Sequence, residues 1–305
     1  MTKIYNEQET IALLPYRQLV ANLKTTVLDY TAGRIVSPER LVVPLQGGAV
    51  MLSMPASAQD IAIHKLVNVC PGNKALGLPT IHGQVMACDP VTGEMLFVLD
   101  GPTVTGRRTA AITALGIQTL WPTSPKAMLL IGTGKQAVNH AEVLAELFPA
   151  AILYVQGSTP SSAAAFCERN RAAAPNLRPV PVSGTPDDVE VVVTLTTSKT
   201  PVYKEPPSTA RLVIGVGAFT PDAAEIAADI VLASTVFVDD PLGAKHEAGD
   251  LIQAKMDWAN VGSLAHAIEH PVPVHKPLLF KSVGCAAWDL AACRVARDIR
   301  SSGSR

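Results

Sequence analysis

The chain has 305 residues, of which 48% are hydrophobic and 17% are charged, and its formal net charge is −1. Because this length exceeds the usual size of a single hydrophobic core, we expect two domains. The nearly neutral charge argues against nucleic acid as the main partner. The sequence has no apolar run of about 18 residues, as a membrane span needs, and no signal-peptide pattern. Its five cysteines form no Cys-x-x-Cys pair, which favours buried thiols in the cytoplasm over disulfides or a metal site.

The first hundred residues predict an α+β domain. A helix is expected from Pro15 to about Thr31, since proline suits a first helical turn and Gly33 follows the end. Strand-like runs follow at residues 41–45, 50–54, 61–69, 84–88 and 95–99. Strands without helices between them predict a mostly antiparallel or mixed sheet. We place this domain at residues 1–115 and expect the last helix, within 285–305, to pack back on it.

The rest of the chain, residues 116–284, alternates strand and helix patterns. Strands are expected at residues 127–131, 152–155, 179–182, 190–195, 212–216 and 235–238. Helices are expected at residues 136–147, 161–174, 222–228 and 263–269. This alternation predicts a parallel sheet covered on both faces, so the fold class is α/β, with a Rossmann-type doubly wound sheet beside the α+β domain.

A glycine-rich turn follows the first strand of this second domain. It reads Gly132-Thr133-Gly134-Lys135-Gln136-Ala137. The first glycine permits the tight turn, the second lets backbone N–H groups approach a pyrophosphate, and Ala137 allows close packing of helix on strand. In this strand–turn–helix context the pattern predicts dinucleotide binding. The alternative is a glycine-rich turn in another doubly wound sheet.

The end of the second strand indicates which dinucleotide is bound. An NAD enzyme usually carries an acid there for the ribose 2′-hydroxyl. This chain has instead Gln156, Gly157, Ser158 and Thr159. Hydroxyl and backbone donors suit a 2′-phosphate that a carboxylate would repel, so NADPH is favoured, with NADH as the alternative. A nearby arginine would have to come from the next helix, as Arg169 or Arg171, unless these form a solvated helix end.

Several motifs outside the glycine turn carry a family resemblance. They are Arg40-Leu41-Val42-Val43-Pro44, Met54-Pro55-Ala56, Lys65-Leu66-Val67-Asn68, Leu99-Asp100-Gly101, Thr105-Gly106-Arg107-Arg108-Thr109-Ala110-Ala111, Val236-Phe237-Val238-Asp239-Asp240 and Phe280-Lys281-Ser282-Val283-Gly284. In these segments the chain resembles the ornithine cyclodeaminase/mu-crystallin family. The resemblance implies a homodimer, with substrate ligands and the subunit interface in the N-terminal domain and a Rossmann-type second domain.

Three cations match the family's substrate ligands: Arg40, Lys65 and Arg108. Arginine forks and an ammonium are suited to an α-carboxylate. Lys65 and Arg108 are also the residues to which the resemblance assigns catalysis. Each has a plainer alternative, namely a surface pair of Arg40 with Glu39, an exposed lysine on a strand, and an arginine on a helix surface.

The resemblance also implies contacts to the cofactor outside the glycine turn. The matching residues are His82, Gly83, Arg108, Thr109, Thr194, Thr196 and Ser282. His82 is alternatively a structural histidine, and Ser282 a cap on the last helix.

One departure from the family concerns the reaction. The cyclodeaminases carry an aspartate after the fifth strand of the second domain, where this chain has Phe219. Phenylalanine cannot act as a base, and it suits a flatter, less polar substrate. Asp222, three residues later, is expected in the first turn of a helix that starts at Pro221. Cyclisation of ornithine is therefore disfavoured.

The resemblance then implies a ketimine reductase. Such an enzyme reduces Δ1-piperideine-2-carboxylate or Δ1-pyrroline-2-carboxylate to L-pipecolate or L-proline with NADPH. The imine must be protonated to accept a hydride readily, and either Lys65 or water is the proton source. Cyclodeaminase activity, an alanine-dehydrogenase-like reaction and a non-catalytic binding protein of the crystallin type are the alternatives.

Overall fold

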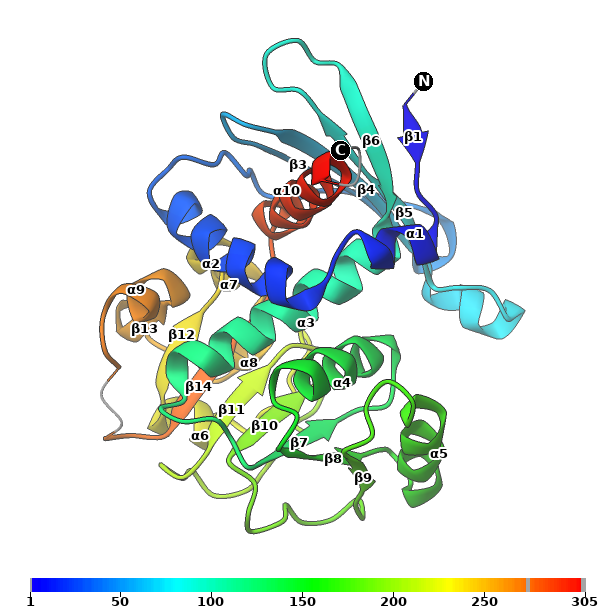
Figure 1. Ribbon diagram of the computed structural model, residues 1–305. Coiled ribbons are helices and arrows are strands. Elements are labelled where there is room, and N and C mark those ends of the chain that lie inside the picture. Colours follow the sequence, from blue (N-terminus) through cyan, green and yellow to red (C-terminus); the bar gives the residue numbers. More distant parts are fainter. Residues whose placement is uncertain (1, 273–274, 303–305) are drawn as a thin grey trace. The chain divides into compact units, whose positions relative to one another are not determined.

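The structure is a computed structural model that describes residues 2–272 and 275–302 (Figure 1). It divides into two compact units. The first comprises Met1–Thr109 and Cys285–Arg305, and the second comprises Ala110–Gly284. The division falls inside helix α3 (Gly101–Leu120), slightly before the boundary that we predicted after residue 115.

The first unit is built on a six-stranded sheet in the order β1-β6-β5-β4-β3-β2. Its strands are β1 (Lys3–Ile4), β2 (Leu41–Pro44), β3 (Val50–Ser57), β4 (Ala62–Val69), β5 (Ile81–Cys88) and β6 (Met95–Asp100). Strand β1 runs parallel to β6, and all other neighbours in this sheet are antiparallel. The sheet is therefore mixed, as the sequence predicted.

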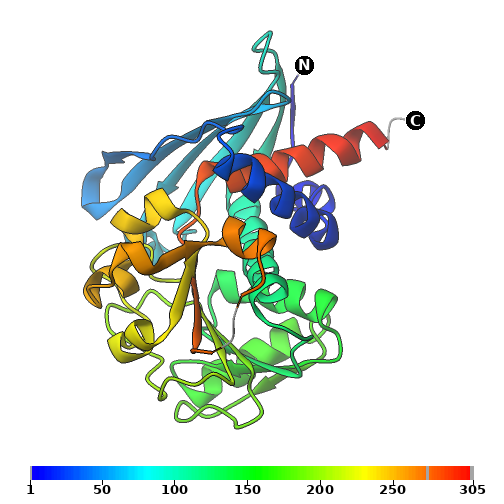
Figure 2. The same ribbon diagram turned by 90° about the vertical axis from the view of Figure 1, so that its left-hand side faces the viewer.

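Helices α2 (Tyr16–Thr31) and α10 (Ala286–Ser302) pack together, and α10 also contacts β3 and β4 (Figures 1 and 2). The expected return of the last helix to this unit is confirmed. Successive residues of a strand face opposite sides, so β4 alternates buried Ile63, Lys65 and Val67 with exposed His64 and Leu66. The face that carries Lys65 is thus the buried face of the sheet.

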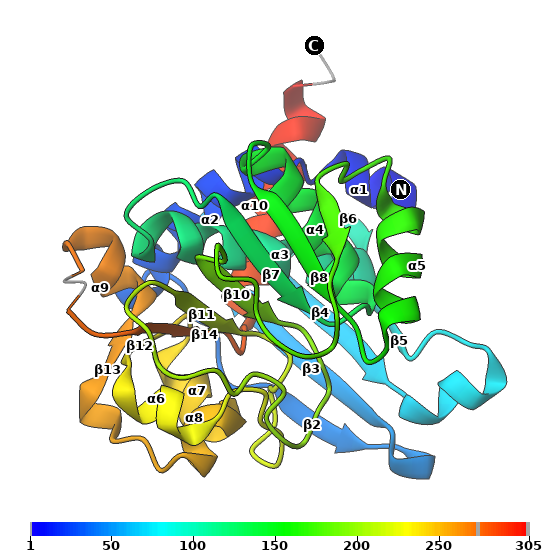
Figure 3. The ribbon, with the colours of Figure 1, turned by 90° about the horizontal axis from the view of Figure 1, so that it is seen from below.

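The second unit contains an eight-stranded sheet in the order β13-β12-β14-β11-β10-β7-β8-β9 (Figure 3). Its strands are β7 (Ala127–Ile131), β8 (Ile152–Gln156), β9 (Leu177–Pro179), β10 (Val191–Thr194), β11 (Leu212–Gly215), β12 (Thr235–Val238), β13 (Val261–Ser263) and β14 (Leu278–Lys281). Every pairing in it is parallel. The doubly wound sheet that the sequence predicted is confirmed.

The helices of this unit pack on the sheet and on each other. Helix α4 (Lys135–Leu147) contacts β8, and α5 (Pro160–Asn170) contacts β8 and β9. Gly116 of α3 faces the ring of Phe280 so closely that a Cβ there would lie 2.6 Å from it. The remaining helices are α1 (Glu7–Ala12) in the first unit, and α6 (Ala228–Ala233), α7 (Pro241–Glu247), α8 (Gly249–Gln253) and α9 (Leu264–Glu269) in the second.

The predicted helix at residues 222–228 is wrong. The chain is not helical there, and α6 begins only at Ala228. The buried carboxylate of Asp250 accepts hydrogen bonds from the backbone N–H groups of Glu225 and Ile226, and Ile226 forms a bridge to Tyr203. These contacts hold the backbone extended, so tertiary partners override the local helix pattern.

Two further differences concern strands. The strand expected at residues 179–182 lies at Leu177–Pro179, and β14 was not predicted. Strand β14 inserts between β11 and β12 and is wholly buried, including Lys281, whose ammonium lies 2.9 Å from a carboxylate oxygen of Asp250. A lysine in a four-residue run conceals a buried strand from sequence patterns, because its ion partner is distant in the chain.

Two features are absent from the described residues. No helix there has both the length and the apolar character that crossing a membrane requires. Likewise, no group of three or more His, Cys, Asp or Glu side chains within residues 2–272 and 275–302 is arranged to hold a metal ion.

Candidate active site

A cluster of charged side chains lies inside the first unit. The ammonium of Lys65, on β4, lies 3.1 and 3.3 Å from the two carboxylate oxygens of Asp289, on α10. Arg108, on α3, directs its Nε to the same carboxylate at 3.3 Å. Two of the three predicted substrate ligands therefore share one acidic partner.

All three groups are removed from solvent. Lys65 is 2% exposed, Arg108 6% and Asp289 0%. The plainer alternatives, an exposed strand lysine and a surface arginine, are therefore wrong. The neighbouring Arg107 is also buried but makes different contacts, since it packs over the ring of Tyr16 and donates to the carbonyl of Leu14.

The cluster carries excess positive charge. Burial, together with the nearby charges of Arg108 and Arg40, lowers the pKa of Lys65 to about 8, although Asp289 acts in the opposite direction. Arg40 is half-buried and directly precedes β2. Its charge, like that of Arg108, acts on Lys65. A site with three cations and one acid is suited to a small carboxylate ligand.

Sequence reasoning missed Asp289. The available signal was a single acid in the middle of the helix segment Ala286-Ala287-Trp288-Asp289-Leu290, which is otherwise apolar. One turn later Cys293 is fully buried, and burial together with the charge of Asp289 raises the pKa of its thiol. An isolated acid on an apolar helix face indicates a buried ion pair, although its partners cannot be read from the pattern.

The structure separates His82 from this cluster. Asn68 and Val67 of β4 pair with His82 and Gly83 of β5, so the pleat turns Gly83 to the face of Lys65 and His82 to the opposite face. His82 is exposed, with a ring nitrogen 3.5 Å from the amide of Asn73. The sequence had grouped His82 with the cofactor ligands, and the strand register does not bring it to Lys65.

Two other predicted cofactor ligands in this unit are buried or enclosed. Gly83 has no room for a side chain, because a Cβ would collide with the carbonyl of Leu66 and lie 2.8 Å from the Cα of Val67. Close packing in the sheet therefore accounts for this glycine by itself. Thr109 is 7% exposed and follows Arg108 on α3.

The glycine turn of the second unit has the geometry expected for a dinucleotide. Gly132 has a φ of 128°, and a Cβ on it would lie 2.8 Å from the carbonyl oxygen of Leu195. Gly134 begins α4 without any side-chain cap and faces open space. A side-chain oxygen of Gln136 is buried without a hydrogen-bond partner among the described residues. The uncapped backbone N–H donors at the start of α4 fit a bound diphosphate.

The turn also lies at the right place in the sheet. The chain proceeds outward from β7 through β8 to β9, and then returns to β10 on the other side of β7. Ligands of doubly wound sheets bind at the carboxyl ends of the strands where the order reverses. Gly132 follows β7 and Leu195 follows β10, so their contact marks this position.

The turn after β8 contains the predicted ribose contacts. Gln156 donates to the carbonyl of Val182, and Thr159 caps α5 in a reciprocal arrangement with Ser162. Ser158 is exposed between them. Gly157 has no space for a side chain, because a Cβ would meet the hydroxyl of Ser162. The turn therefore presents hydroxyl and backbone groups and no acid.

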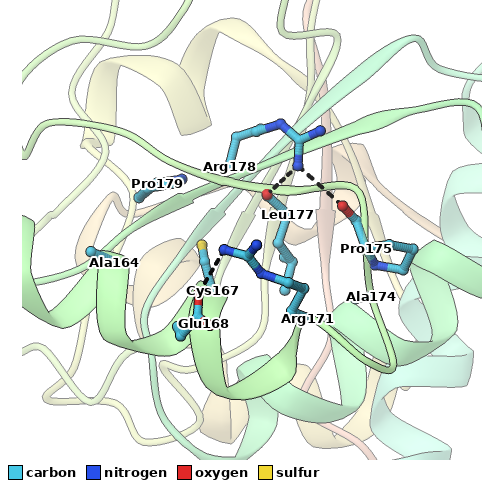
Figure 4. A pocket seen from close by; sticks show the side chains of 9 residues that line it. All are labelled: Ala164, Cys167, Glu168, Arg171, Ala174, Pro175, Leu177, Arg178 and Pro179. Atoms are coloured by element: carbon cyan, nitrogen blue, oxygen red, sulfur yellow. Dashed lines mark hydrogen bonds and ion pairs between the residues drawn. The ribbon is translucent and has the colours of Figure 1, made fainter.

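Arg169 and Arg171 lie at the other end of α5. The helix is roughly 16 Å long at 1.5 Å per residue; Arg169 lies in its last turn and Arg171 is the residue that follows it. Arg171 pairs with Glu168 at 2.6 Å and lines a pocket between α5 and β9 (Figure 4). The pocket is lined by Ala164, Cys167, Glu168, Arg171, Ala174, Pro175, Leu177, Arg178 and Pro179. These arginines therefore do not reach the ribose turn.

The segments after β10 and β11 are held by a buried acid. Glu225 accepts hydrogen bonds from the backbone N–H groups of Thr196 at 2.5 Å, Gly217 at 2.6 Å and Ala218 at 3.0 Å. Glu225 is fully buried, and burial raises the pKa of its carboxyl. Thr194 is itself buried and donates to the carbonyl of Ile214. Glu225, which the sequence analysis did not single out, thus sets the backbone at the carboxyl edge.

Phe219 lies at the same edge, directly after these bonded residues, and is 44% exposed. Asp222 does not begin a helix as expected. It accepts from the hydroxyl of Thr220 at 2.7 Å and pairs with Lys199 at 2.6 Å. The carboxylate of Asp222 is thus committed to an exposed pair.

Ser282 already has a partner in the structure. Its hydroxyl donates to Asp239 at 2.8 Å, and the same carboxylate accepts from the backbone of Val283 and Gly284. Because α10 begins at Ala286, the alternative of Ser282 as its cap is wrong. Asp239 fixes the segment between β14 and α10, and Ser282 is part of that arrangement.

Comparison with known proteins identifies the family. The sequence matches the ornithine cyclodeaminase/mu-crystallin family over residues 2–304. The chain belongs to this family.

Members with curated names span almost the same length. The chain is 65% identical to Delta(1)-pyrroline-2-carboxylate reductase 1 of Burkholderia multivorans, covering 97% of this chain and 96% of that one. It is 64% identical to the Delta(1)-pyrroline-2-carboxylate/Delta(1)-piperideine-2-carboxylate reductase of Azospirillum brasilense, covering 97% and 95%. The mouse ketimine reductase mu-crystallin is 30% identical, with 93% of each chain covered.

A solved structure of similar fold is the Thermococcus litoralis Delta(1)-pyrroline-2-carboxylate reductase in complex with NADH and L-proline. Its TM-score is 0.89 at 22% identity, and the match covers 99% of this chain and 98% of that one. At this identity the likeness shows the fold shared across the family.

Proposed function

We propose that this protein reduces the cyclic imino acids Δ1-pyrroline-2-carboxylate and Δ1-piperideine-2-carboxylate to L-proline and L-pipecolate, with NADPH as the hydride donor. The observation that carries the proposal is the buried pair of Lys65 and Arg108 with the half-buried Arg40, which together have the charge and donors for a small carboxylate. Curated relatives at 64% and 65% identity are named for these substrates.

The three cations anchor the carboxylate of the imino acid. Arg108 offers a planar fork, and Lys65 a point charge with three donors. Holding the carboxylate fixes the position of the adjacent C=N carbon, and such positioning is a large part of catalysis in a hydride transfer. The anchor is rigid, because Lys65 lies in the middle of a sheet and Arg108 in the middle of a long helix.

The cofactor is held by the second unit. The glycine turn from Gly132 to Gln136 receives the diphosphate on backbone donors, and the segment from Thr194 to Thr196 borders it at the carboxyl edge. When bound, the nicotinamide supplies the hydride. The hydroxyl-rich turn of Ser158 and Thr159, without an acid, supports NADPH over NADH as the preferred cofactor.

Lys65 is suited to supply the proton. The protonated imine accepts a hydride more readily than the neutral form, so a proton must be near the ring nitrogen. The pKa of Lys65, lowered to about 8 by burial, leaves the ammonium mostly charged at neutral pH yet more acidic than an ordinary lysine. Anchor and proton source can therefore be the same side chain.

A substrate panel tests this function. Purified protein with NADPH and either cyclic ketimine is expected to consume the reduced cofactor, measured as falling absorbance, and to do so more slowly with NADH. Lack of turnover with both ring sizes would reject the proposal. Pyruvate with ammonium and ornithine with NAD⁺ form two further arms, which detect an alanine-dehydrogenase-like reaction and cyclodeaminase activity. Phe219 argues against the second, because a phenyl ring cannot take a proton from the substrate amine.

We also infer a homodimer through the first unit's sheet. Leu41 and Leu66 lie in one cross-strand row of its outward face, with Ser53 between them, and are 62% and 38% exposed. Exposed apolar side chains on a sheet face favour association with a second copy.

A further inference from the structure

We propose that Asp289 is the positioning residue of the substrate site: it holds Lys65 and Arg108 in the arrangement that receives the imino acid's carboxylate. This inference deepens the proposed function and rests on it. Asp289 does not itself contact the substrate. It acts through the two cations that do.

The contacts between Asp289 and the nitrogen atoms of Lys65 and Arg108 support this role. The ammonium of Lys65 contacts both oxygens of Asp289, at 3.1 and 3.3 Å, which fixes the direction of a long and otherwise flexible side chain. Arg108 contacts Asp289 through Nε. The edge of the guanidinium that carries the two terminal nitrogens is the one that forms a fork with a second carboxylate. Asp289 thus orients both cations by accepting hydrogen bonds from some of their N–H groups. The other N–H groups of Lys65 and Arg108 are left to bind the ligand.

Charge balance supports it as well. The buried Lys65 and Arg108 and the half-buried Arg40 repel one another, and buried charges require opposite partners. When Lys65 passes its proton to the imine, one positive charge moves from the ammonium to the ring nitrogen, and the total charge of the site stays the same. The fully buried carboxylate of Asp289 lowers the electrostatic free-energy cost of the positive charges both before and after the imine is protonated. Its removal is therefore expected to weaken substrate binding even when the fold persists.

The same contacts predict an effect on proton binding. The charged groups that act on Lys65 are Asp289, Arg108 and Arg40, and the buried thiol of Cys293 adjoins Asp289. Asp289 opposes the three influences that lower the pKa of Lys65. Without the negative charge, Lys65 loses its proton at a lower pH, so the alkaline decline of kcat/KM moves to lower pH.

The test compares Asp289→Asn with wild type and with Asp60→Asn. Asp60 is an acid of the same unit that pairs with Arg294 and Arg297 near the surface. For Asp289→Asn we expect KM for the ketimine to rise roughly ten-fold or more, and the alkaline limb to shift down by about one pH unit. NADPH affinity, measured by fluorescence titration, should stay unchanged, as should the pH profile of Asp60→Asn.

A double-mutant cycle separates positioning from general destabilisation. If Asp289 acts through Lys65, Asp289→Asn should cost much less in a Lys65→Met background than in wild type. Equal costs in both backgrounds, or a folded Asp289→Asn variant with unchanged KM and pH limb, would overturn the proposal. Should that variant fail to fold, Asp289→Glu decides: retained charge must keep the alkaline limb near its wild-type pH, and a downward shift there contradicts the role.

The inference can fail independently of the proposed function. If wild type reduces neither ketimine, the reaction assignment is wrong, but binding of a flat ring carboxylate remains measurable. Thermal stabilisation by pyrrole-2-carboxylate should then be weaker in Asp289→Asn than in wild type and in Asp60→Asn. Equal stabilisation of all three proteins would reject the positioning role itself.

Discussion

At the scale of single residues, the first unit's cluster shows how burial changes ordinary side chains. Lys65 occupies a strand position that packing would normally give to an apolar residue, since Ile63 and Val67 flank it on the same face. The position is tolerated because Asp289 provides an opposite charge from a helix far away in sequence. A lysine in this setting has altered acidity, which is the usual mark of a functional group.

The first prediction follows from that acidity. With a pKa of about 8, Lys65 loses its proton as the pH rises above 8, so kcat/KM for Δ1-pyrroline-2-carboxylate should decline there through a higher KM. The folded pKa lies below the ordinary 10.5, so between about pH 8 and 10.5 only the unfolded chain holds this proton and this group's contribution to stability rises with pH. Above pH 8, kcat/KM should therefore fall without a matching fall in the melting temperature. A parallel fall of both would contradict this assignment.

The second prediction uses the adjacent arginines as a matched pair. Arg108→Lys keeps a positive charge but removes the planar fork, so KM for the ketimine should rise roughly ten-fold with little change in melting temperature. Arg107→Lys loses the stacking on Tyr16 and should lower the melting temperature while KM stays near wild type. Steady-state kinetics and thermal unfolding of both variants check this. The reverse pattern would show that Arg107 and not Arg108 binds the substrate.

At the scale of elements, the carboxyl edge of the second unit's sheet is organised by turns and buried acids. The strand–turn–helix of β7 and α4 was predicted from sequence, because its glycines and apolar runs are local features. Glu225 and Asp239 were not, because each accepts backbone hydrogen bonds from segments that only the fold brings near. The remote bonds of Asp250 also explain why residues 222–228 do not form the expected helix.

The third prediction separates the two glycines of the turn. Gly132→Ala should destabilise the protein, because a Cβ would meet the carbonyl of Leu195 at 2.8 Å and the φ of 128° disfavours alanine. Gly134→Ala has space and an ordinary backbone, so its melting temperature should match wild type. Its methyl group should nevertheless weaken NADPH binding about ten-fold or more, by keeping the diphosphate from the helix N-terminus. Unchanged affinity in Gly134→Ala would remove this turn from the binding site.

The fourth prediction concerns Glu225→Gln. The amide keeps one acceptor oxygen but replaces the other with a donor that faces backbone N–H groups, so we expect a loss of roughly 1–3 kcal/mol in unfolding free energy. NADPH affinity should fall as well, since the segment after β10 loses its anchor. Denaturant unfolding and cofactor titration measure the two effects. Wild-type values for both would show that the segment is held by other contacts.

At the scale of the whole molecule, the division into two units matches two kinds of chemistry. The first unit contains the buried cations Lys65 and Arg108 beside Asp289, and the second has a glycine turn and a parallel sheet of the kind that nucleotide-binding domains use. The same first unit has an outward sheet face with exposed leucines, opposite the face that α10 covers. Under the proposed function, assembly and catalysis both depend on one mixed sheet.

The fifth prediction tests that assembly. Light scattering of the purified protein should give about twice the chain's 32.1 kDa. Leu66→Asp places a charge on the outward sheet face and should shift the protein toward the monomer, whereas Val91→Asp, at an 88% exposed position in the turn before β6, should not. A monomeric wild type would reject the dimer, and a Leu66→Asp variant that stays dimeric would show that the interface lies elsewhere.

The amino-acid pattern alone was enough to predict the local features: the glycine turn, most of the strands, and the helix that returns to the first unit. These depend on short-range patterns or on motifs that are continuous in the chain. The three-dimensional arrangement was needed to learn that Asp289 joins Lys65 and Arg108, that the pleat turns His82 away, and that Arg171 lies far from the ribose turn. The pairing of Lys65 with Asp289 spans 224 residues, and neither such a distant pair nor the strand register that turns His82 leaves a periodic trace in the sequence.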